Sequence, residues 1–185
     1  MKKAFLLLLF PLLSFSQEIE KDYIDEFTKE HIISTKFEEL STNTCFIAFR
    51  IVKRDLGNIL NLKMIFSTDP IMISEKDKIM IMFSDNTIKE LYPERLYTSC
   101  RGCGAIGLRG SNAPGFNVYY GISLEDIDDF KNKNIIKIRL NTSYTYRDTL
   151  VKEKQSNLFK DTFSLVYKNE ERKFFLININ SSQNL

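Results

Sequence analysis

The chain is poor in the residues that carry most recognisable chemistry. Its 185 residues include one histidine, three cysteines and no tryptophan. A single histidine excludes metal sites built from several imidazoles, and it leaves His31 as the only imidazole for a catalytic triad. A strong excess of one charge is also missing, because 26 basic side chains face 24 acidic ones. The composition therefore gives no signature of nucleic-acid binding, and it indicates no reaction.

Apolar side chains, by contrast, are plentiful. Hydrophobic residues make up 43% of the chain, with 15 phenylalanines and 8 tyrosines. This is enough apolar surface for a packed core, so the composition excludes an intrinsically disordered chain. The length is typical of a single domain.

Residues 1–16 have the three regions of a secretory signal peptide. Lys2 and Lys3 precede a mostly apolar run from Ala4 to Leu13, and a short polar segment follows it. The run is shorter than the roughly 20 apolar residues of a membrane-spanning helix. We therefore expect export to the periplasm or beyond, with cleavage after about Ser16 and no transmembrane segment in the mature chain.

Removal of the signal changes the charge balance. It shortens the chain from 185 to 169 residues and takes away two lysines and no acid, which leaves 24 basic and 24 acidic side chains. The mature chain is formally neutral, and it contains no long basic or acidic block that would steer it toward a polyanion or a charged membrane.

The mature chain divides by composition into three parts. Residues 17–30 are mostly charged and are expected to form a polar lead-in, as a loop or a single helical turn. Residues 31–180 are expected to form a single α+β domain. Residues 181–185 are polar and are expected to fray.

Two β-hairpins are predicted from apolar residues that recur at every second position. In the first, such residues alternate on both sides of a turn-forming segment at 55–58, so we expect a hairpin over residues 44–67 that Asp69-Pro70 ends. The second runs from residues 79–83 through a turn at 85–86 to residues 88–92. Its first strand is apolar on both faces, which predicts a central strand covered on two sides.

Two helices complete the predicted fold. A short helix is expected over about residues 123–133, because Ser123 and Asp126 have the spacing of a capping box. A longer C-terminal helix is expected over about residues 148–168, with Asp148 as its cap, and a final strand at residues 175–179. The fold class is thus α+β, with a mainly antiparallel sheet.

Residues 94–115 interrupt the strand pattern and contain five of the seven glycines, which predicts a long loop. Within it Cys100 and Cys103 form a C-x-x-C motif. In an oxidising compartment we favour a disulfide between these two, although a bridge from Cys45 to either would close a larger ring and stabilise the fold more. Cys45 itself is expected to be a buried thiol in a strand. Zinc needs four ligands, so we expect no metal site and no cofactor.

The same loop is the candidate binding site. Arg101 and Arg109 flank a glycine-rich backbone, and amides at Gly102 and Gly104 would suit a carboxylate, sulfate or phosphate. The alternative is an ordinary solvated loop. Because no helix follows, the G-x-G-x-x-G spacing within the loop does not predict a nucleotide site. His31, which has no identifiable nucleophile beside it, is expected to be an ordinary strand histidine.

Several short segments together resemble small exported proteins of Gram-negative bacteria. They are Asp25-x-Phe27-Thr28, the loop from Cys100 to Leu108, the run from Ser123 to Asp126, and the run from Ile136 to Arg139. The resemblance covers roughly residues 25–167, and only the loop is specific. It implies an exported α+β domain with a distinctive loop, and it implies no reaction, cofactor or partner.

The sequence as a whole favours a non-catalytic binding or interaction module of the cell envelope that presents the loop at residues 94–115. The expected partner is an envelope protein or a small anionic ligand. The alternative is a thiol–disulfide redox protein that uses Cys100 and Cys103.

Overall fold

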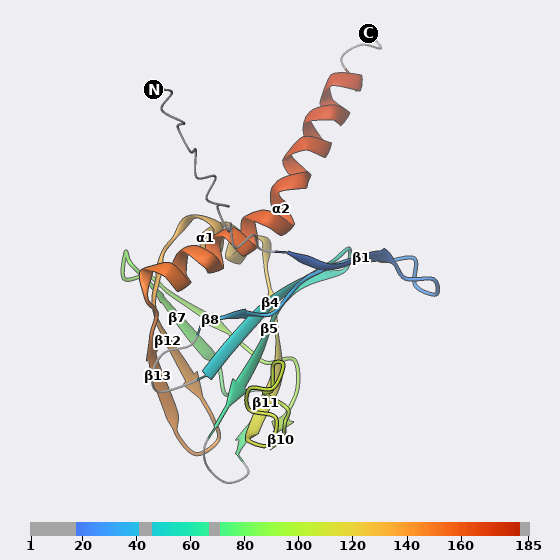
Figure 1. Cartoon of the computed structure of the whole chain (residues 1–185). Coiled ribbons are helices and arrows are strands. Elements are labelled where there is room, and N and C mark those ends of the chain that lie inside the picture. Colours follow the sequence, from blue (N-terminus) through green and yellow to red (C-terminus); the bar gives the residue numbers. More distant parts are fainter. Residues whose placement is uncertain (1–17, 41–45, 67–70, 182–185) are drawn as a thin grey trace, which may run out of the picture.

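The computed structural model describes residues 18–40, 46–66 and 71–181, with side chains up to Tyr167 (Figure 1). The expected signal peptide, Cys45, Asp69-Pro70 and residues 182–185 lie outside this part. Over the described residues the fold is α+β, with mostly antiparallel sheets and two helices, the second of them C-terminal. The predicted fold class is therefore confirmed.

The larger sheet has seven strands, in the order β1-β2-β4-β5-β11-β10, with the short β3 paired to β4. The strands are β1 (Ile19–Ile24), β2 (His31–Thr35), β3 (Glu38–Glu39), β4 (Phe46–Arg54), β5 (Gly57–Ile65), β10 (Cys100–Arg101) and β11 (Pro114–Ile122). The first predicted hairpin is confirmed as β4 and β5. Its turn is shorter than expected, because Arg54 pairs directly with Gly57 and only two residues lie between them.

The smaller sheet has four strands, in the order β13-β12-β7-β8. Its members are β7 (Ile79–Phe83), β8 (Ile88–Leu91), β12 (Ile135–Asn141) and β13 (Tyr146–Leu150), while β6 (Met72–Ile73) and β9 (Tyr97–Thr98) form a separate pair. The second predicted hairpin is confirmed as β7 and β8. Asn86 takes a positive φ of 65° in its turn, a conformation that asparagine tolerates better than most residues.

Strand β7 is central, as predicted, but it is covered on one side only. Ile79, Ile81 and Phe83 are buried in the core. Met80 and Met82, on the other face, are half-buried and line a groove open to solvent. The sequence pattern was that of a strand packed on both faces, and no described element packs against this second face.

The short helix is confirmed as α1 (Leu124–Asn132), and its N-terminus shows why it begins there. The Ser123 hydroxyl accepts a hydrogen bond from the amide of Asp126 at 3.1 Å, and the Asp126 carboxylate accepts one from the amide of Ser123 at 2.7 Å. This reciprocal pair satisfies two amides that a helix would otherwise leave free.

The C-terminal helix, α2 (Glu153–Ser181), differs from the prediction at both ends. Asp148 does not cap it; it lies in β13, where its carboxylate binds Arg139 at 2.6 and 2.8 Å and Lys137 at 2.6 Å across the sheet. These ion pairs hold the residue in the strand. The strand predicted at residues 175–179 is wrong, because the helix continues through that segment, which contains no glycine or proline to end it.

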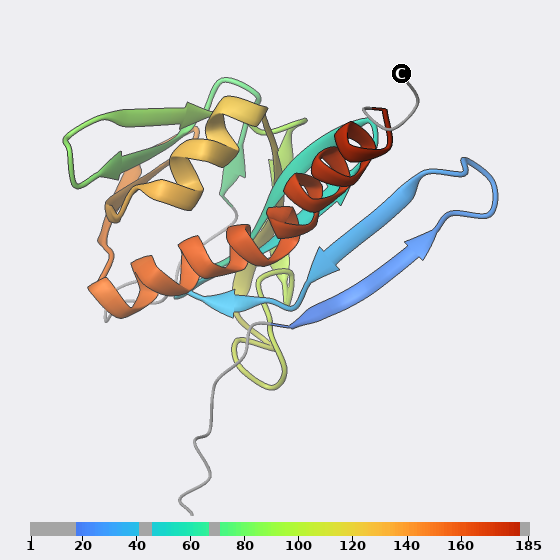
Figure 2. The same ribbon diagram turned by 90° about the horizontal axis from the view of Figure 1, so that it is seen from above.

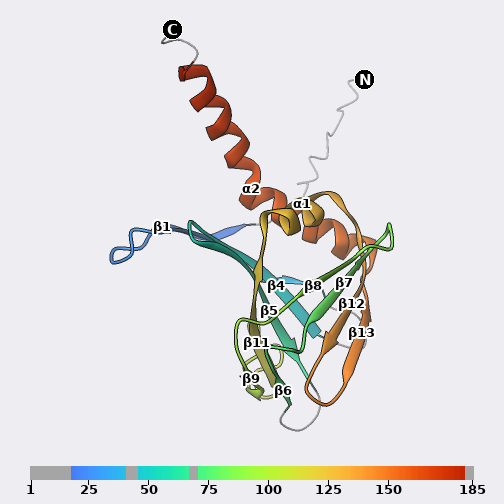
Figure 3. The ribbon, with the colours of Figure 1, turned by 180° about the vertical axis from the view of Figure 1, so that it is seen from behind.

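One hydrophobic core joins the two sheets and both helices. Its centre is aromatic: Phe130 of α1 packs against Phe159 and Phe163 of α2 with ring centroids 5.3 and 4.9 Å apart, and Phe159 packs against Phe49 of β4 at 4.7 Å. Figure 3 shows both helices lying across one end of the two sheets. Neither helix of the described chain is long and apolar enough to cross a membrane.

The expected polar lead-in is in part a strand. Its residues 19–24 form β1, which pairs antiparallel with β2 although every one of its side chains is exposed. An edge strand needs no apolar face when its backbone is paired, and its charged side chains discourage further pairing. We call β1, β2 and the turn between them, residues 19–35, the wing, because they project from the body of the molecule (Figures 1 and 2).

Candidate functional site

The predicted disulfide is present: Cys100 and Cys103 are paired, with their Cα atoms 5.4 Å apart. This separation is ordinary for a disulfide. Cys100 is exposed at the end of β10, and the chain then passes through residues 102–113, which we call the glycine loop, before it enters β11. The predicted loop at 94–115 is thus interrupted by the short strands β9 and β10, and it ends where β11 begins at Pro114.

The glycine loop lies flat against the outer face of the larger sheet. A Cβ atom at Gly104 would be 2.1 Å from the carbonyl oxygen of Met64, and one at Gly110 would be 2.1 Å from Cδ1 of Ile65. The Met64 oxygen belongs to the backbone of β5, so Gly104 requires glycine for this close approach. The end of the Ile65 side chain can move aside, and at Gly110 it is the positive φ of 69° that favours glycine. The glycines therefore serve packing between the loop and the strand.

Several backbone amides of the loop, including that of Gly102, are engaged within the loop. The amide of Gly102 donates to the carbonyl of Ala113 at 3.0 Å, that of Ala105 to Gly102 at 2.9 Å, and that of Arg109 to Ile106 at 3.1 Å. In addition, the Lys63 ammonium donates to the carbonyl of Ala105 at 3.1 Å. The loop is closed by its own hydrogen bonds.

The two arginines of the loop differ in their surroundings. The Arg109 guanidinium binds both oxygens of Glu39, at 2.8 and 3.1 Å, and lies over the ring of Phe46 at 4.5 Å. Arg101 is exposed, and its side chain has no partner in the described part of the chain. Of the four residues predicted to bind an anion, Gly102 and Arg109 are thus already bonded. The anion site in the loop stays a prediction, and its geometry favours a structural cover instead.

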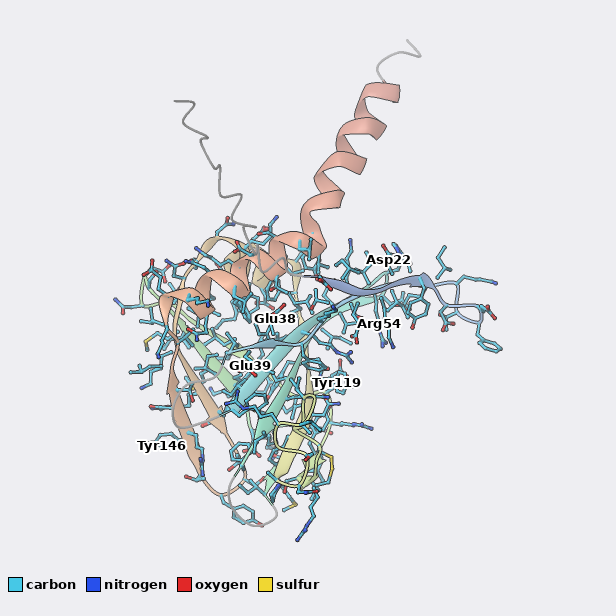
Figure 4. The ribbon with its side chains drawn as sticks, viewed as in Figure 1. Asp22, Glu38, Glu39, Arg54, Tyr119 and Tyr146 are labelled. Atoms are coloured by element: carbon cyan, nitrogen blue, oxygen red, sulfur yellow. A yellow bond between two sulfur atoms is a disulfide. The ribbon has the colours of Figure 1, made fainter. Side chains whose placement is uncertain are left out.

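A cleft of about 370 Å³ lies elsewhere, where the wing leaves the body of the molecule. The wing, the turn between β4 and β5, the start of α1 and the buried part of α2 surround it. It is lined by Asp22, His31, Ile33, Lys53, Arg54, Asp55, Asn58, Leu124, Val166 and Tyr167. Figure 4 labels Asp22 on the wing and Arg54 at the end of β4. The volume of the cleft is in the range of small-molecule sites.

His31 forms part of this cleft and is firmly held. Its Nε2 lies 2.6 Å from Oδ1 of Asp22, and its backbone amide donates to Oδ2 of Asp55 at 2.8 Å. It lies in strand β2, as the sequence indicated. The contact with Asp22 lies within the wing, while the bond to Asp55 ties the wing to the turn at residues 55–56, and each carboxylate of the cleft thus has a partner.

The opposite wall combines hydrogen-bonding and cationic groups. The buried Tyr167 donates its hydroxyl proton to Oδ1 of Asn58 at 2.8 Å, and the Lys53 ammonium lies over the Tyr167 ring at 5.5 Å. The side chain of Arg54, which is exposed, forms no hydrogen bond or ion pair with any described residue. The cleft thus contains one guanidinium whose five donors are free for a ligand.

The lining combines charged, amide and apolar side chains. Among the cleft residues of the described chain there is no serine, threonine or cysteine beside the imidazole of His31. Nor do three or more histidine, cysteine or acidic side chains gather as a metal site within the described ranges. The described residues of the cleft therefore contain neither a nucleophile paired with His31 nor a cluster of metal ligands.

Sequence reasoning missed the cleft because its residues come from five separate segments between residues 22 and 167. No short motif connects them. The only local signal was the run Lys53-Arg54-Asp55 at a hairpin turn, which is also typical of a solvated turn.

Comparison of the chain with known protein families, curated proteins and solved structures finds no match to any of them. The resemblance to small exported bacterial proteins therefore stays a prediction.

Proposed function

We propose that the protein is an exported, non-catalytic binding module that takes a small carboxylate ligand in the cleft between the wing and α2. The unpartnered Arg54 at the edge of a 370 Å³ cleft is the observation that carries this proposal. Export rests on the signal-peptide pattern of residues 1–16.

The choice of a carboxylate follows from the shape of the available groups. A guanidinium presents its donors as a planar fork that matches the two oxygens of a carboxylate. Asn58 lies in the same cleft, and its amide NH₂ has no hydrogen bond to described residues. Because Asp22 and Asp55 are each bonded to His31, they leave Arg54 free to bind an anion.

The remaining walls favour a ligand that also has an apolar part. Ile33, Leu124 and Val166 line the cleft and offer hydrocarbon surface beside the charged groups. Binding sites commonly combine apolar walls with a few polar groups that fix orientation. Inorganic anions would leave these walls in contact with water, so we favour an organic acid.

The proposal can be tested with benzoate, which has a carboxylate on an apolar ring, and benzamide, which has the same shape without the charge. In a titration of the ¹⁵N-labelled mature chain, benzoate should shift the signals of the Asn58 side chain and the His31 amide, and benzamide should not. Equal shifts by both compounds, or shifts confined to other regions, would overturn the proposal.

The second candidate is thiol–disulfide exchange, favoured by the exposure of Cys100 within its C-x-x-C motif. Neither cysteine is at the N-terminus of a helix, since β10 leads into the glycine loop, so helix-dipole stabilisation of a thiolate is missing. A bridge that resists a glutathione buffer, together with a Cys100 thiol that titrates near the ordinary value of about 8.5, would eliminate this candidate.

A further inference from the structure

The outer face of the smaller sheet contains an apolar groove that no described element covers. Met80, Met82 and Ile88 form its floor, Lys137 and Arg139 form its rim, and its volume is about 100 Å³. Ile88 is 48% exposed. We call this groove, formed by Met80, Met82, Ile88, Lys137 and Arg139, the methionine groove. Unbranched methionine side chains adapt to a partner and make favourable sulfur contacts with aromatic rings.

The groove has a small positive charge. Lys137 and Arg139 share the single carboxylate of Asp148, while Lys78 is balanced by Glu90 at 2.6 Å. One positive charge on this face is therefore uncompensated. An acidic partner with an exposed aromatic side chain would complement both the charge and the apolar floor.

The wing of the same protein has these properties at its tip. Phe27 is 95% exposed and lies in the turn at residues 25–30, which contains three acidic residues and one lysine. Leu56, 91% exposed, lies in the neighbouring turn, and its amide donates to Glu30 at 3.3 Å. The tip is thus apolar and acidic, the complement of the groove.

Hydrogen bonds order the backbone of the turn that presents Phe27. The Asp25 carboxylate accepts hydrogen bonds from the amides of Phe27 and Thr28, at 3.0 and 2.7 Å, and from the Thr28 hydroxyl at 3.0 Å. These bonds hold the pKa of Asp25 below its ordinary value, with the Thr28 amide making the largest contribution. Because the backbone of the turn is already ordered, binding through this turn loses less conformational entropy than binding through a flexible loop would.

We infer that the tip of the wing of one molecule inserts Phe27 into the methionine groove of a second copy of the chain. The wing and the smaller sheet lie on opposite sides of the body in both Figure 1 and Figure 3. Contacts between opposite sides of identical molecules are head-to-tail, and they build rings or open chains in place of closed dimers.

A two-fold pairing of the grooves is less favourable, because of the charges that surround them. In the sheet, Asp148, Arg139, Met80 and Glu90 lie side by side on adjacent strands. A two-fold axis parallel to the strands would place Asp148 opposite Glu90 of the other copy, which brings two negative charges together. An axis perpendicular to the strands, in the plane of the sheet, would place Arg139 opposite Lys137 of the other copy, which brings two positive charges together. The acidic tip of the wing avoids both repulsions.

Sedimentation velocity of the mature chain, from about 10 μM to about 1 mM, tests this inference over the range in which weak assemblies dissociate. We expect wild-type assemblies to grow beyond two chains as concentration rises. Phe27→Ser should weaken association by at least about 30-fold, the loss typical of an aromatic hot spot. Leu108→Ser is the matched control, because Leu108 is also 95% exposed but lies in the glycine loop; it should associate like the wild type.

A mixing experiment identifies the two surfaces. Phe27→Ser retains an intact groove and Met82→Gln an intact tip, so each alone should be monomeric, while their mixture should form a two-chain species and nothing larger. Ile88→Ser replaces Met82→Gln if that variant does not fold. A monomeric wild type, equal effects of Phe27→Ser and Leu108→Ser, or a mixture without the two-chain species would overturn the inference.

Further experiments distinguish self-association from membrane binding at the tip and from carboxylate binding in the cleft. Flotation of a monomeric wild type with phosphatidylethanolamine–phosphatidylglycerol vesicles, lost in Phe27→Ser, would assign the tip to a membrane and refute self-association. Since Phe27 and Met82 do not line the cleft, their variants should bind benzoate as the wild type does. Failure of one proposal is thus distinguishable from failure of the other.

Discussion

Replacement of Gly104 by alanine tests the structural role assigned to the glycine loop. The added methyl group would be 2.1 Å from the carbonyl oxygen of Met64 and 3.2 Å from Cγ1 of Ile65. The backbone of β5 is fixed by β4 and β11 on its two sides, so the loop must move instead. A displacement of about 1 Å or more is needed to restore ordinary contact distances.

The expected cost follows from what the loop covers. Its displacement uncovers Ile65 and loosens the contact of Arg109 with Phe46, which is only 8% exposed. Loss of the burial of about one large apolar side chain corresponds to about 1.5–3 kcal/mol of unfolding free energy. We therefore expect Gly104→Ala to destabilise the protein by that amount.

Gly121→Ala is the matched control. Gly121 lies in β11 without a positive φ, and nothing lies within 4 Å of the place where its Cβ would be. The substitution should be neutral, or should stabilise by up to about 1 kcal/mol through the unfolded state. Urea unfolding followed by far-UV circular dichroism, with the disulfide intact, measures both variants. Equal stabilities for Gly104→Ala and Gly121→Ala would refute the reasoning.

Two further predictions concern the core and the acid limit of stability. Phe130→Ala removes a fully buried ring at the centre of the aromatic cluster and should lower the free energy of unfolding in urea by about 3–5 kcal/mol. Leu124→Ala, at an exposed position of the same helix, should lower it by less than about 0.5 kcal/mol. Similar losses in the two variants would contradict the assigned core. Hydrogen bonds from Thr87, and a weaker contribution from Lys133, lower the pKa of Asp85 from 3.8 to about 2. Because the folded-state pKa is the lower one, this group stabilises the fold above pH 3.8, and the stabilisation is lost as the pH falls through about 2. Between pH 3.8 and about 2, the urea concentration at the midpoint of unfolding should therefore fall less in Asp85→Asn than in wild type. An equal dependence of this midpoint on pH in the two proteins would rule out the assignment.

Local chemistry explains why several elements were predictable from the sequence. The helix at 124–132 was found because Ser123 and Asp126 satisfy each other's amides within one turn. The hairpin of β4 and β5 was found because its alternating apolar residues are buried on one face. In both cases the deciding contacts lie close together in the sequence.

The errors arose where distant partners decide the structure. Asp148 resembles a helix cap until Arg139 and Lys137 are placed across the strand from it. The lead-in of the mature chain resembles a solvated segment until β2 pairs with its backbone. Sequence patterns report periodicity and local capping chemistry, but they do not report which distant backbone or charge a residue will meet.

The same limit applies to the candidate site. The glycine loop drew attention because its cysteines and glycines are consecutive, yet its geometry is that of a cover bonded to itself. The cleft went unnoticed because Asp22, Arg54 and Tyr167 are far apart in the sequence. Clustering along the chain therefore indicated a structural motif here, while the residues of the proposed binding site are brought together only by the fold.

The most direct test of the proposed function compares two arginines. Arg54 lines the cleft and Arg101 lies at the edge of the glycine loop; both are exposed, and neither side chain has a partner among the described residues. The measurement is the dissociation constant of benzoate for Arg54→Gln and for Arg101→Gln, obtained from the same ¹⁵N titration. We predict that Arg54→Gln weakens binding at least about tenfold, the loss of one charge-assisted pair, while Arg101→Gln leaves it unchanged. The reverse order, or no difference between the two variants, would contradict the assignment of the cleft.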